Sequence, residues 1–405
     1  MNILYVNTQF NGGGAEKVAR QLFLKTGEKE EVNTYFLGGK GPAGDKSVEI
    51  VIKDRSLLQI YNKVKNLLTN NARNTDYIFR KKILRLIKLY KIDIVHFHNI
   101  HGNYMGIMDI ASLPSKCKVI WTIHDMWPIT GHCAHPLYCN KWIDEECIKC
   151  TQLKLYPGMR LDRAAYKYKI KKKTFQHKGI IYVSPSKWLK EQCGKSFLKN
   201  EKIIEINNGV NINKFKCIEK SKVREKYGLL SDKTILMFAS SNIDNPYKGF
   251  DILVKALNSI QNKNDYCLLI VGKGTNISQI KNFDCRCMGY IQDDEIMNEL
   301  YALSDVFILP SVAENFPCSI LESFASGTPV IASKVGGIPE EINEETGWLI
   351  EAGNSEELAR VIESLPDQKE KILKMGIACR KRVEDNFSED KMVNEYLDLY
   401  LKELQ

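Results

Sequence analysis

The most constraining feature of this sequence is a pattern of short apolar segment, turn and amphipathic segment that occurs in two separate stretches. The apolar segments have the length of buried strands, and the amphipathic segments have apolar residues at helical spacing. Their alternation predicts parallel sheets covered by helices, and therefore an α/β fold. The expected strands are residues 3–7, 34–37, 92–96, 119–123 and 180–183, then 234–239, 266–271, 305–309 and 329–332. The expected helices are residues 15–23 and 77–90, then 249–260, 293–302, 317–325 and 355–365.

The length of 405 residues is typical of two domains rather than one. A polar, turn-rich segment at 207–215 follows a strand-like run at 202–206, so the domain boundary is expected there. A last amphipathic stretch at 389–404 predicts a C-terminal helix. Doubly wound domains bind ligands at the carboxyl ends of their strands, so two such domains facing one another would hold a ligand in the cleft between them.

The formal net charge of +9 favours an anionic partner, such as nucleotide phosphates, nucleic acid or acidic lipid headgroups. No nucleic-acid recognition motif accompanies the charge, so no nucleic-acid partner is expected. No apolar run has the length of a membrane span, and residues 1–10 have the pattern of a strand rather than of a signal peptide, which indicates a cytoplasmic protein. The charge is concentrated at 160–178, which is interpreted either as a solvated helix face or as a patch that rests on a membrane surface. This segment carries Arg160, Arg163, Lys167, Lys169, Lys171, Lys172, Lys173 and Lys178.

A glycine-rich turn, Gly12, Gly13 and Gly14, lies directly after the first expected strand and before the first helix. Glycine lets the backbone approach an anion closely, and the free amides of a helix N-terminus attract one. Three glycines also suit a tight turn that binds nothing. The turn alone is therefore weak evidence for a phosphate site.

The segment 311–322 also connects an expected strand to an expected helix, and it is the most specific in the chain. Pro317 suits the first helical turn, where its missing N–H costs little, and the amides of Cys318 and Ser319 would then face a phosphate or a sugar oxygen. Glu314 precedes the helix and Glu322 lies in its second turn. The two carboxylates could face one ligand, Glu314 near a sugar and Glu322 near ribose hydroxyls. The alternative is a pair of solvated surface glutamates.

Four of the twelve cysteines form a cluster: Cys133, Cys139, Cys147 and Cys150. Cys147 and Cys150 have the two-residue gap of a zinc knuckle, which suggests a structural zinc site of four thiolates. Reduced thiols in a loop, or a disulfide that the cytoplasm disfavours, are the alternatives.

Taken together, several segments resemble the retaining glycosyltransferases of family 4, in the same order along the chain. They are residues 12–16, 122–125, 183–186, 207–211, 248–253, 314–322, 325–330 and 336–340. The match runs nearly from end to end, and 38–91 is its least informative region. Residues 127–131 with the cysteine cluster resemble the exopolysaccharide and colanic-acid branch of that family.

The resemblance implies the GT-B fold, in which two Rossmann-like domains face one another across a cleft. Residues 1–206 with a C-terminal helix at 387–405 would form the acceptor side, and residues 207–386 would bind the nucleotide sugar. The reaction would retain the anomeric configuration and require no metal or cofactor. The donor would be a UDP, GDP or ADP sugar. The acceptor would be a glycan or polyprenyl-linked glycan of capsule, exopolysaccharide or O-antigen synthesis, with the enzyme at the inner face of the plasma membrane.

The resemblance also implies roles for single residues. Lys248 would neutralise the departing diphosphate, Glu322 would hold the ribose, and Glu314 would hold the hydroxyls of the donor sugar. His124 would hydrogen-bond the sugar near the reacting carbon, which makes it catalytic together with Glu314 and Lys248. A lysine and helix-terminal amides can stabilise the charge on a diphosphate without a metal ion. The donor site would further contain Gly13, Gly14, Asn315, Phe316, Cys318 and Ser319, and the acceptor side Gly12 and Asp125.

The chain departs from the family pattern at a few positions. Many members carry an arginine shortly before the lysine, whereas residues 240–245 contain none. Asn211 replaces a common aspartate, and Asn315 and Pro317 replace glycines, which would reshape the sugar pocket. The missing arginine supports the alternative of an inactive relative that binds nucleotide sugars or glycans. The spacing of Glu314 and Glu322 argues against epimerisation, and no lysine-bound cofactor motif supports phosphorolysis.

Overall fold

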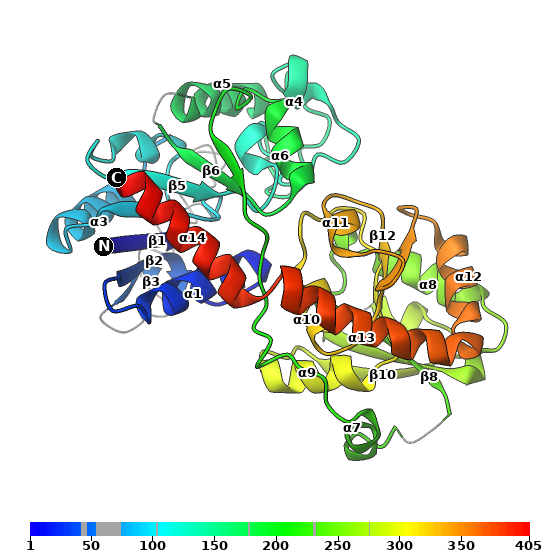
Figure 1. Cartoon of the computed structure of the whole chain (residues 1–405). Helices are drawn as coiled ribbons and strands as arrows, with labels where there is room; N and C mark the ends of the chain where they lie inside the picture. Colours follow the sequence, from blue (N-terminus) through cyan, green and yellow to red (C-terminus); the bar gives the residue numbers. More distant parts are fainter. Residues whose placement is uncertain (42–46, 54–73, 103, 177–178, 230–231, 275) are drawn as a thin grey trace. The chain divides into compact units, whose positions relative to one another are not determined.

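The computed structural model of the chain describes residues 1–41, 47–53, 74–102, 104–176, 179–229, 232–274 and 276–405. The chain forms two compact units (Figure 1). Unit 1 comprises Met1–Asn207 together with Val393–Gln405, and unit 2 comprises Asn208–Met392. Each unit is built on one parallel sheet with helices on its faces. The predicted α/β class with two Rossmann-like domains is therefore confirmed. The chain returns to unit 1 inside the C-terminal helix, later than the predicted boundary at 386/387.

The sheet of unit 1 has the strand order β3-β2-β1-β4-β5-β6-β7. The alternation of apolar and amphipathic segments did not predict β3, because this strand lies within residues 38–91, where the sequence is least informative. All four residues of β4, Ile-Val-His-Phe, are buried. Burial of whole strands in this way explains why they appear in the sequence as short, mostly apolar runs. The strands are β1 (Asn2–Asn7), β2 (Asn33–Gly41), β3 (Val48–Lys53), β4 (Ile94–Phe97), β5 (Lys118–Thr122), β6 (Ile181–Ser184) and β7 (Ile203–Glu205).

Amphipathic helices cover the faces of this sheet. In α3 the carboxylate of Asp76 accepts hydrogen bonds from the backbone of Ile78 and Phe79, which caps the helix, and its buried residues join the main core of the unit. The helices of unit 1 are α1 (Gly14–Gly27), α3 (Tyr77–Leu89), α4 (Lys141–Asp144), α5 (Ala164–Phe175), α6 (Lys187–Gly194) and most of α14 (Glu389–Leu404), with 3₁₀ turns η1 (Ile107–Ser112) and η2 (Trp127–Ile129).

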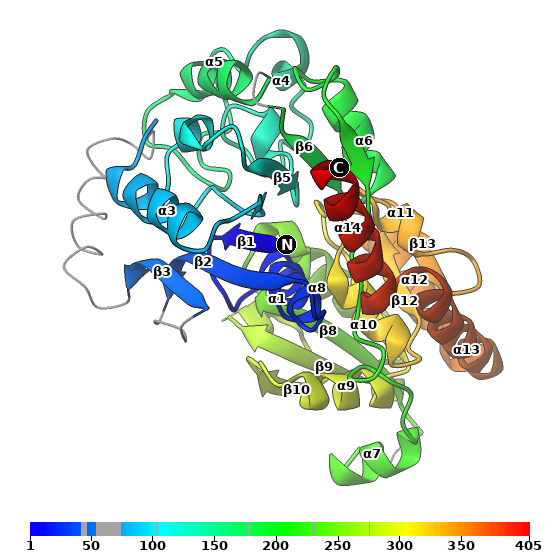
Figure 2. The same ribbon diagram turned by 60° about the vertical axis from the view of Figure 1, so that its left-hand side comes forward.

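Helix α14 packs on the sheet of unit 1 although it is far from the strands in sequence (Figures 1 and 2). Two fully buried tyrosines make this contact. Tyr400 Oη lies 2.7 Å from Nδ1 of His96 on β4 and 3.2 Å from the hydroxyl of Tyr5 on β1. Tyr396 Oη lies 2.7 Å from Oγ1 of Thr122 on β5. The last helix therefore completes the polar interior of the first unit.

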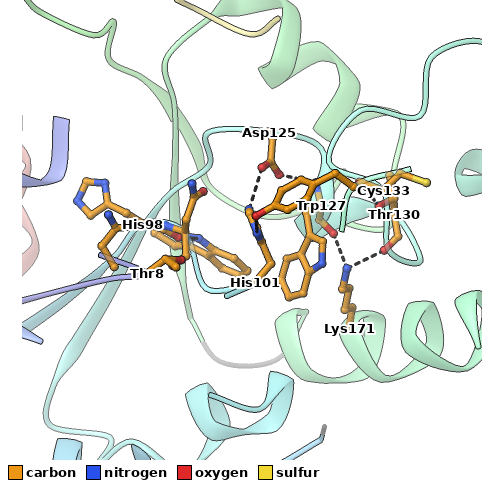
Figure 3. Close-up of polar contacts among 12 residues, drawn as sticks. Thr8, His98, His101, Asp125, Trp127, Thr130, Cys133 and Lys171 are labelled. Atoms are coloured by element: carbon orange, nitrogen blue, oxygen red, sulfur yellow. Dashed lines mark hydrogen bonds and ion pairs between the residues drawn. The ribbon is translucent and has the colours of Figure 1, made fainter. Parts of the chain in front are cut away.

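The basic segment at 160–178 forms α5 at its centre, and the interpretation as a solvated helix face is wrong for two of its lysines. Lys167 and Lys171 are buried. Lys171 Nζ donates to the carbonyl oxygens of Trp127 (2.5 Å) and Thr130 (3.0 Å) and lies 3.5 Å from the centre of the Trp127 ring (Figure 3). Burial lowers the pKa of Lys171 well below its ordinary value, and its side chain is enclosed within unit 1, so it is not available to a membrane surface. Lys178 lies outside the described residues.

The sheet of unit 2 has the order β10-β9-β8-β11-β12-β13 and is covered on both faces. Along β8, Ile235 and Met237 join the core with α9, α10 and α13, whereas Leu236 and Phe238 join the core with α8 and α12. The strands are β8 (Thr234–Asn242), β9 (Tyr266–Lys273), β10 (Asp284–Gly289), β11 (Val306–Leu309), β12 (Val330–Ser333) and β13 (Gly347–Ile350). The helices are α7 (Lys220–Lys226), α8 (Phe250–Ser259), α9 (Asp294–Leu303), α10 (Cys318–Ala325), α11 (Ile338–Glu341), α12 (Ser355–Ser364) and α13 (Lys369–Asn386), with 3₁₀ turns η3 (Pro246–Lys248), η4 (Lys263–Asp265), η5 (Asn276–Gln279) and η6 (Pro366–Gln368).

In both sheets the strand order reverses at one place, between β1 and β4 in unit 1 and between β8 and β11 in unit 2. Such a switch point leaves a crevice outside the carboxyl ends of the two strands, where doubly wound domains bind ligands. The topology therefore points to the loops that follow these strands. Among the described residues, no helix combines the length and the apolar character that crossing a membrane requires.

Candidate active site

The switch point of unit 2 brings Lys248 and Glu314 together. Lys248 ends η3, which follows β8, and Glu314 lies in the loop after β11. Lys248 Nζ donates to Glu314 Oε1 at 2.5 Å, and the Ser311 hydroxyl donates to the same oxygen at 3.0 Å. The Lys248 side chain is 30% exposed, whereas only 11% of the Glu314 side chain is exposed. This ion pair places a cation and a carboxylate at the edge where a ligand would bind.

Backbone contacts fix this ion pair. Gly249 has φ +68°, and a Cβ atom there would lie 1.8 Å from the carbonyl oxygen of Pro310, so the position requires glycine. The amide of Val312 donates to the carbonyl oxygen of Tyr247 at 2.9 Å. The turn that carries Lys248 is thereby held against the loop that carries Glu314.

Helix α10 begins at Cys318, so Pro317 is its N-cap rather than its first helical residue. Glu322 is 6% exposed, and the Tyr301 hydroxyl donates to its Oε2 at 3.3 Å. Since Glu314 and Glu322 are both largely buried, the alternative of two solvated surface glutamates is wrong. Asn315 and Phe316 are buried as well.

Backbone anchors explain the burial of this loop. The carbonyl oxygen of Asn315 accepts from the amide of Gly337, and that of Phe316 accepts from Nδ2 of Asn208, each at 2.8 Å. Cys318 is buried and Ser319 is partly exposed. Contact of these residues with a donor stays a prediction.

Glu341, on α11, was not predicted as part of the site. It is 0% exposed, and neither of its carboxylate oxygens has a hydrogen-bond partner among the described residues. Burial, and next the charge of Glu314, raise the pKa of Glu341 well above its ordinary value. The adjacent pair Glu340 and Glu341 after Pro339 was the available signal.

In unit 1 the glycine turn follows β1 at the switch point. Gly12, Gly13 and Gly14 are exposed, and Gly13 is the N-cap of α1. The Glu16 side chain packs against Gly12 of this turn, and burial raises the pKa of its carboxyl group. Exposed amides at a helix start suit an anion or a sugar oxygen, which agrees with the expectation for this turn without testing it.

His124 follows β5 and faces His98, which follows β4. Nε2 of His124 lies 2.9 Å from Nδ1 of His98, and the two rings are stacked. Burial lowers the pKa of His124 to about 4 and that of His98 well below its ordinary value, so both are neutral at pH 7.

The second ring nitrogen of His98, Nε2, indicates which of the two histidines carries the proton between the rings. This nitrogen is buried and has no partner among the described residues. An N–H there would be a buried donor without an acceptor, which is costly. The arrangement therefore favours a proton on Nδ1 of His98, donated to Nε2 of His124. His124 then carries its own proton on Nδ1.

These histidines make unit 1 sensitive to acid. Burial lowers the pKa of His96 to about 3 and that of His124 to about 4, whereas unfolded histidine titrates near 6.5. The unfolded chain takes up these protons first, so their contribution to stability is complete above about pH 6.5 and is lost as the pH falls towards 4 and 3. We expect the urea midpoint of unit 1 to fall over this range, and to fall less steeply in His124→Asn. Equal midpoints at pH 7 and pH 4 would contradict this.

Asp125 acts through a histidine that sequence reasoning missed. Its Oδ2 lies 2.9 Å from Nε2 of His101, and its Oδ1 accepts from the amide of Trp127 at 2.8 Å (Figure 3). Burial raises the pKa of Asp125, but the charge and hydrogen bond of His101 outweigh it, so the pKa is lowered. On its other side, Nδ1 of His101 lies 3.4 Å from the Tyr156 hydroxyl. Three histidines within residues 96–101, at the end of a strand, were the signal for this group.

Comparison with known proteins gives two family matches. The model described as Glycosyltransferase Family 4 matches residues 12–214, and the model described as Glycosyl transferases group 1 matches residues 233–368. A putative colanic acid biosynthesis glycosyl transferase of Escherichia coli K12 is 24% identical over 99% of both chains. A UDP-Gal:alpha-D-GlcNAc-diphosphoundecaprenol alpha-1,3-galactosyltransferase of Escherichia coli is 27% identical over 79% of this chain and 78% of its own. The crystal structure of Anabaena HepE in complex with UDP matches with a TM-score of 0.70 at 17% identity, over 99% of this chain and all of that one.

Proposed function

Because this chain belongs to glycosyltransferase family 4 and is a glycosyltransferase of polysaccharide biosynthesis, we propose that it transfers a sugar from a uridine diphosphate donor to a lipid-linked glycan, with retention of the anomeric configuration. The observation that carries the proposal is the Lys248–Glu314 ion pair at the switch point of unit 2. Uridine is favoured over guanosine and adenosine because one relative is named for UDP-Gal and one structural neighbour holds UDP.

The donor would bind at unit 2. The Lys248 ammonium would turn from Glu314 to the diphosphate and stabilise the charge that develops as the sugar–phosphate bond breaks. Glu314, released from Lys248 and still held by Ser311, would accept hydrogen bonds from the sugar hydroxyls. Glu322, held by Tyr301, would accept hydrogen bonds from the ribose hydroxyls. This division of roles requires no metal ion.

The residues of unit 1 would serve the acceptor and the sugar. His124, with its proton on Nδ1, would donate to an oxygen of the donor sugar near the reacting carbon. Asp125 is a positioning residue, because its carboxylate is bound to His101 and to the backbone. We assign the contact with the acceptor hydroxyl to His101, and we assign no nucleophile. Gly12 would lie on the acceptor side, and Gly13 and Gly14 would approach the diphosphate.

The acceptor proposed is a polyprenyl diphosphate-linked glycan, as in the name of the galactosyltransferase relative. Such an acceptor lies at a membrane surface. The cations of the segment around α5 that are exposed, Arg160, Arg163, Lys169 and Lys173, would contact anionic headgroups there.

Isothermal titration of the protein with UDP, GDP and ADP tests the donor site. We expect UDP to bind most tightly, and Glu322→Gln to weaken it about tenfold or more, because a carboxylate–hydroxyl hydrogen bond contributes about 1.5–3 kcal/mol. Glu356→Gln, an exposed glutamate on α12, is the matched control and should bind as the wild type does. Loss of UDP affinity in the control, or none in Glu322→Gln, would refute the assignment.

Turnover separates the proposed enzyme from an inactive relative. The wild type should release UDP from a UDP-sugar when a polyprenyl-linked acceptor is supplied. Tight UDP binding without release for any UDP-sugar and acceptor tested would favour a protein that only binds the donor.

A further inference from the structure

Five side chains of the types that bind zinc line one cavity in unit 1, and none of them is assigned to sugar transfer. They are His132, Cys133, Cys139, Cys147 and Cys150, between η2 and α5. All four cysteines are free thiols. The sequence pattern suggested four thiolates, and the structure adds an imidazole to them.

The distances between these donors match those around a zinc ion. Nε2 of His132 lies 3.4 Å from Sγ of Cys150 and 3.5 Å from Sγ of Cys133. Zinc binds sulfur at about 2.3 Å and imidazole nitrogen at about 2.0–2.1 Å, so tetrahedral geometry separates two such ligands by roughly 3.5 Å. The two nitrogen–sulfur distances at His132 therefore each equal one edge of such a tetrahedron.

The neighbours of these donors have the arrangement that supports a metal. Nδ1 of His132 lies 3.1 Å from the carbonyl oxygen of Pro157, so it carries the proton and Nε2 presents a lone pair to the two sulfurs. The amide of Gly131 donates to Sγ of Cys147 at 3.1 Å, as amides do to metal-bound thiolates. A lone pair facing two sulfur atoms needs either thiol protons or a cation between them.

The backbone of the turn before Cys150 is strained. Glu146, Cys147 and Lys149 all have positive φ, between 48° and 58°. Such backbone is costly for residues other than glycine and persists where the surroundings enforce it. Among the described residues, no three His, Cys, Asp or Glu side chains yet enclose a single point closely enough to hold a metal ion. Side-chain rotation of the thiols towards Nε2 of His132 would close the site, as is usual when metal binding is coupled to ordering.

We propose that this cluster binds a structural zinc ion through the thiolates of Cys133, Cys147 and Cys150, with His132 Nε2 or the thiolate of Cys139 as the fourth ligand. Four protein ligands leave no open position, so the ion has no part in sugar transfer. It holds the loop next to Asp125: the amide of Met126 donates to Ala134, which follows Cys133, and the amide of Ala134 donates to Tyr156. The zinc thereby fixes the Trp127 and Tyr156 segments around the Asp125–His101 pair.

Metal analysis of the full chain tests the proposal. Protein purified with reductant and without chelator should contain about one zinc ion per chain. Cys133→Ser, Cys147→Ser and Cys150→Ser should each lose it, whereas Cys193→Ala, which removes a buried thiol of the same unit outside the cluster, should keep it. Of His132→Gln and Cys139→Ser, the one that loses zinc identifies the fourth ligand.

A second measurement uses only wild-type protein and therefore tests the proposal even if the cysteine variants fail to fold. Wild-type protein stripped of zinc and loaded with Co²⁺ should show the intense near-ultraviolet absorption of thiolate–cobalt charge transfer. Wild-type protein that contains no zinc and takes up neither Zn²⁺ nor Co²⁺ would overturn the proposal. Retention of zinc in Cys150→Ser would overturn it as well.

Discussion

Lys248→Ala is expected to lower turnover of the UDP-sugar by about 10²–10³-fold, the usual effect of removing one preorganised group that stabilises developing negative charge. The side chain is 30% exposed and the turn that carries it is fixed by backbone contacts, so unit 2 should remain folded. UDP release from the UDP-sugar under saturating donor measures the effect. Lys255→Ala, an exposed lysine on α8, is the matched control and should keep wild-type turnover.

A double variant separates two causes of this loss. Lys248→Ala leaves the Glu314 carboxylate without its cation, and this carboxylate could repel the diphosphate by itself. If repulsion were the cause, Lys248→Ala combined with Glu314→Gln would recover affinity for UDP, which carries no sugar for Glu314 to bind. We expect no recovery, because Lys248 acts on the leaving group. Wild-type turnover in Lys248→Ala would contradict the role of Lys248 altogether.

Tyr400→Ala is expected to destabilise unit 1 by about 3–5 kcal/mol, the typical cost of truncating a buried aromatic side chain. The side chain is fully buried, and its loss also leaves His96 Nδ1 without a partner. Tyr400→Phe keeps the ring and should cost only about 1–3 kcal/mol, the price of an unsatisfied buried polar group. Leu401→Ala, at a neighbouring residue that is 53% exposed, should have little effect.

Tryptophan fluorescence during urea unfolding measures this effect on unit 1. Four of the five tryptophans, Trp121, Trp127, Trp142 and Trp188, belong to unit 1, and only Trp348 belongs to unit 2. Since the two units need not unfold together, the transition of unit 1 is the relevant one. If Tyr400→Ala and Leu401→Ala shifted this transition equally, α14 would not be an integral part of unit 1.

The central strands and their helices could be predicted from sequence because burial on both faces leaves a continuous apolar run, as in β9 and β11. Three of the four edge strands, β3, β10 and β13, were not predicted, whereas β7 lies within the run expected at 202–206. The exposed strand β10 has the sequence Asp-Cys-Arg-Cys-Met-Gly and pairs only with β9, so it contains no apolar run to detect. Polar composition at an edge is how sheets avoid further pairing, and it removes the signal on which prediction depends.

The candidate site was also only partly predictable from the sequence. Glu314 could be proposed from the segment that connects a strand to a helix, and Lys248 from the family resemblance, and the structure brings the two side chains together. The link between Asp125 and His101 joins the ends of two strands, β5 and β4, and no spacing along the chain indicates which side chains will meet across that distance. The burial of Lys171 was not predictable for a related reason. The carbonyl oxygens that it binds come from an irregular turn whose shape depends on tertiary packing.

The position of Tyr396 and Tyr400 has a consequence for synthesis of the chain. Most of unit 1 precedes unit 2 in the chain, yet Tyr396 and Tyr400, whose side chains help to fill its interior, follow unit 2 and are translated after it. A ribosome that adds about 5–20 residues per second takes roughly 10–40 s to translate residues 208–392. During that time Tyr5, His96 and Thr122 lack their hydrogen-bond partners on α14. The first unit therefore cannot finish folding as it emerges, and a nascent chain stalled within unit 2 would expose an incomplete core to chaperones and proteases.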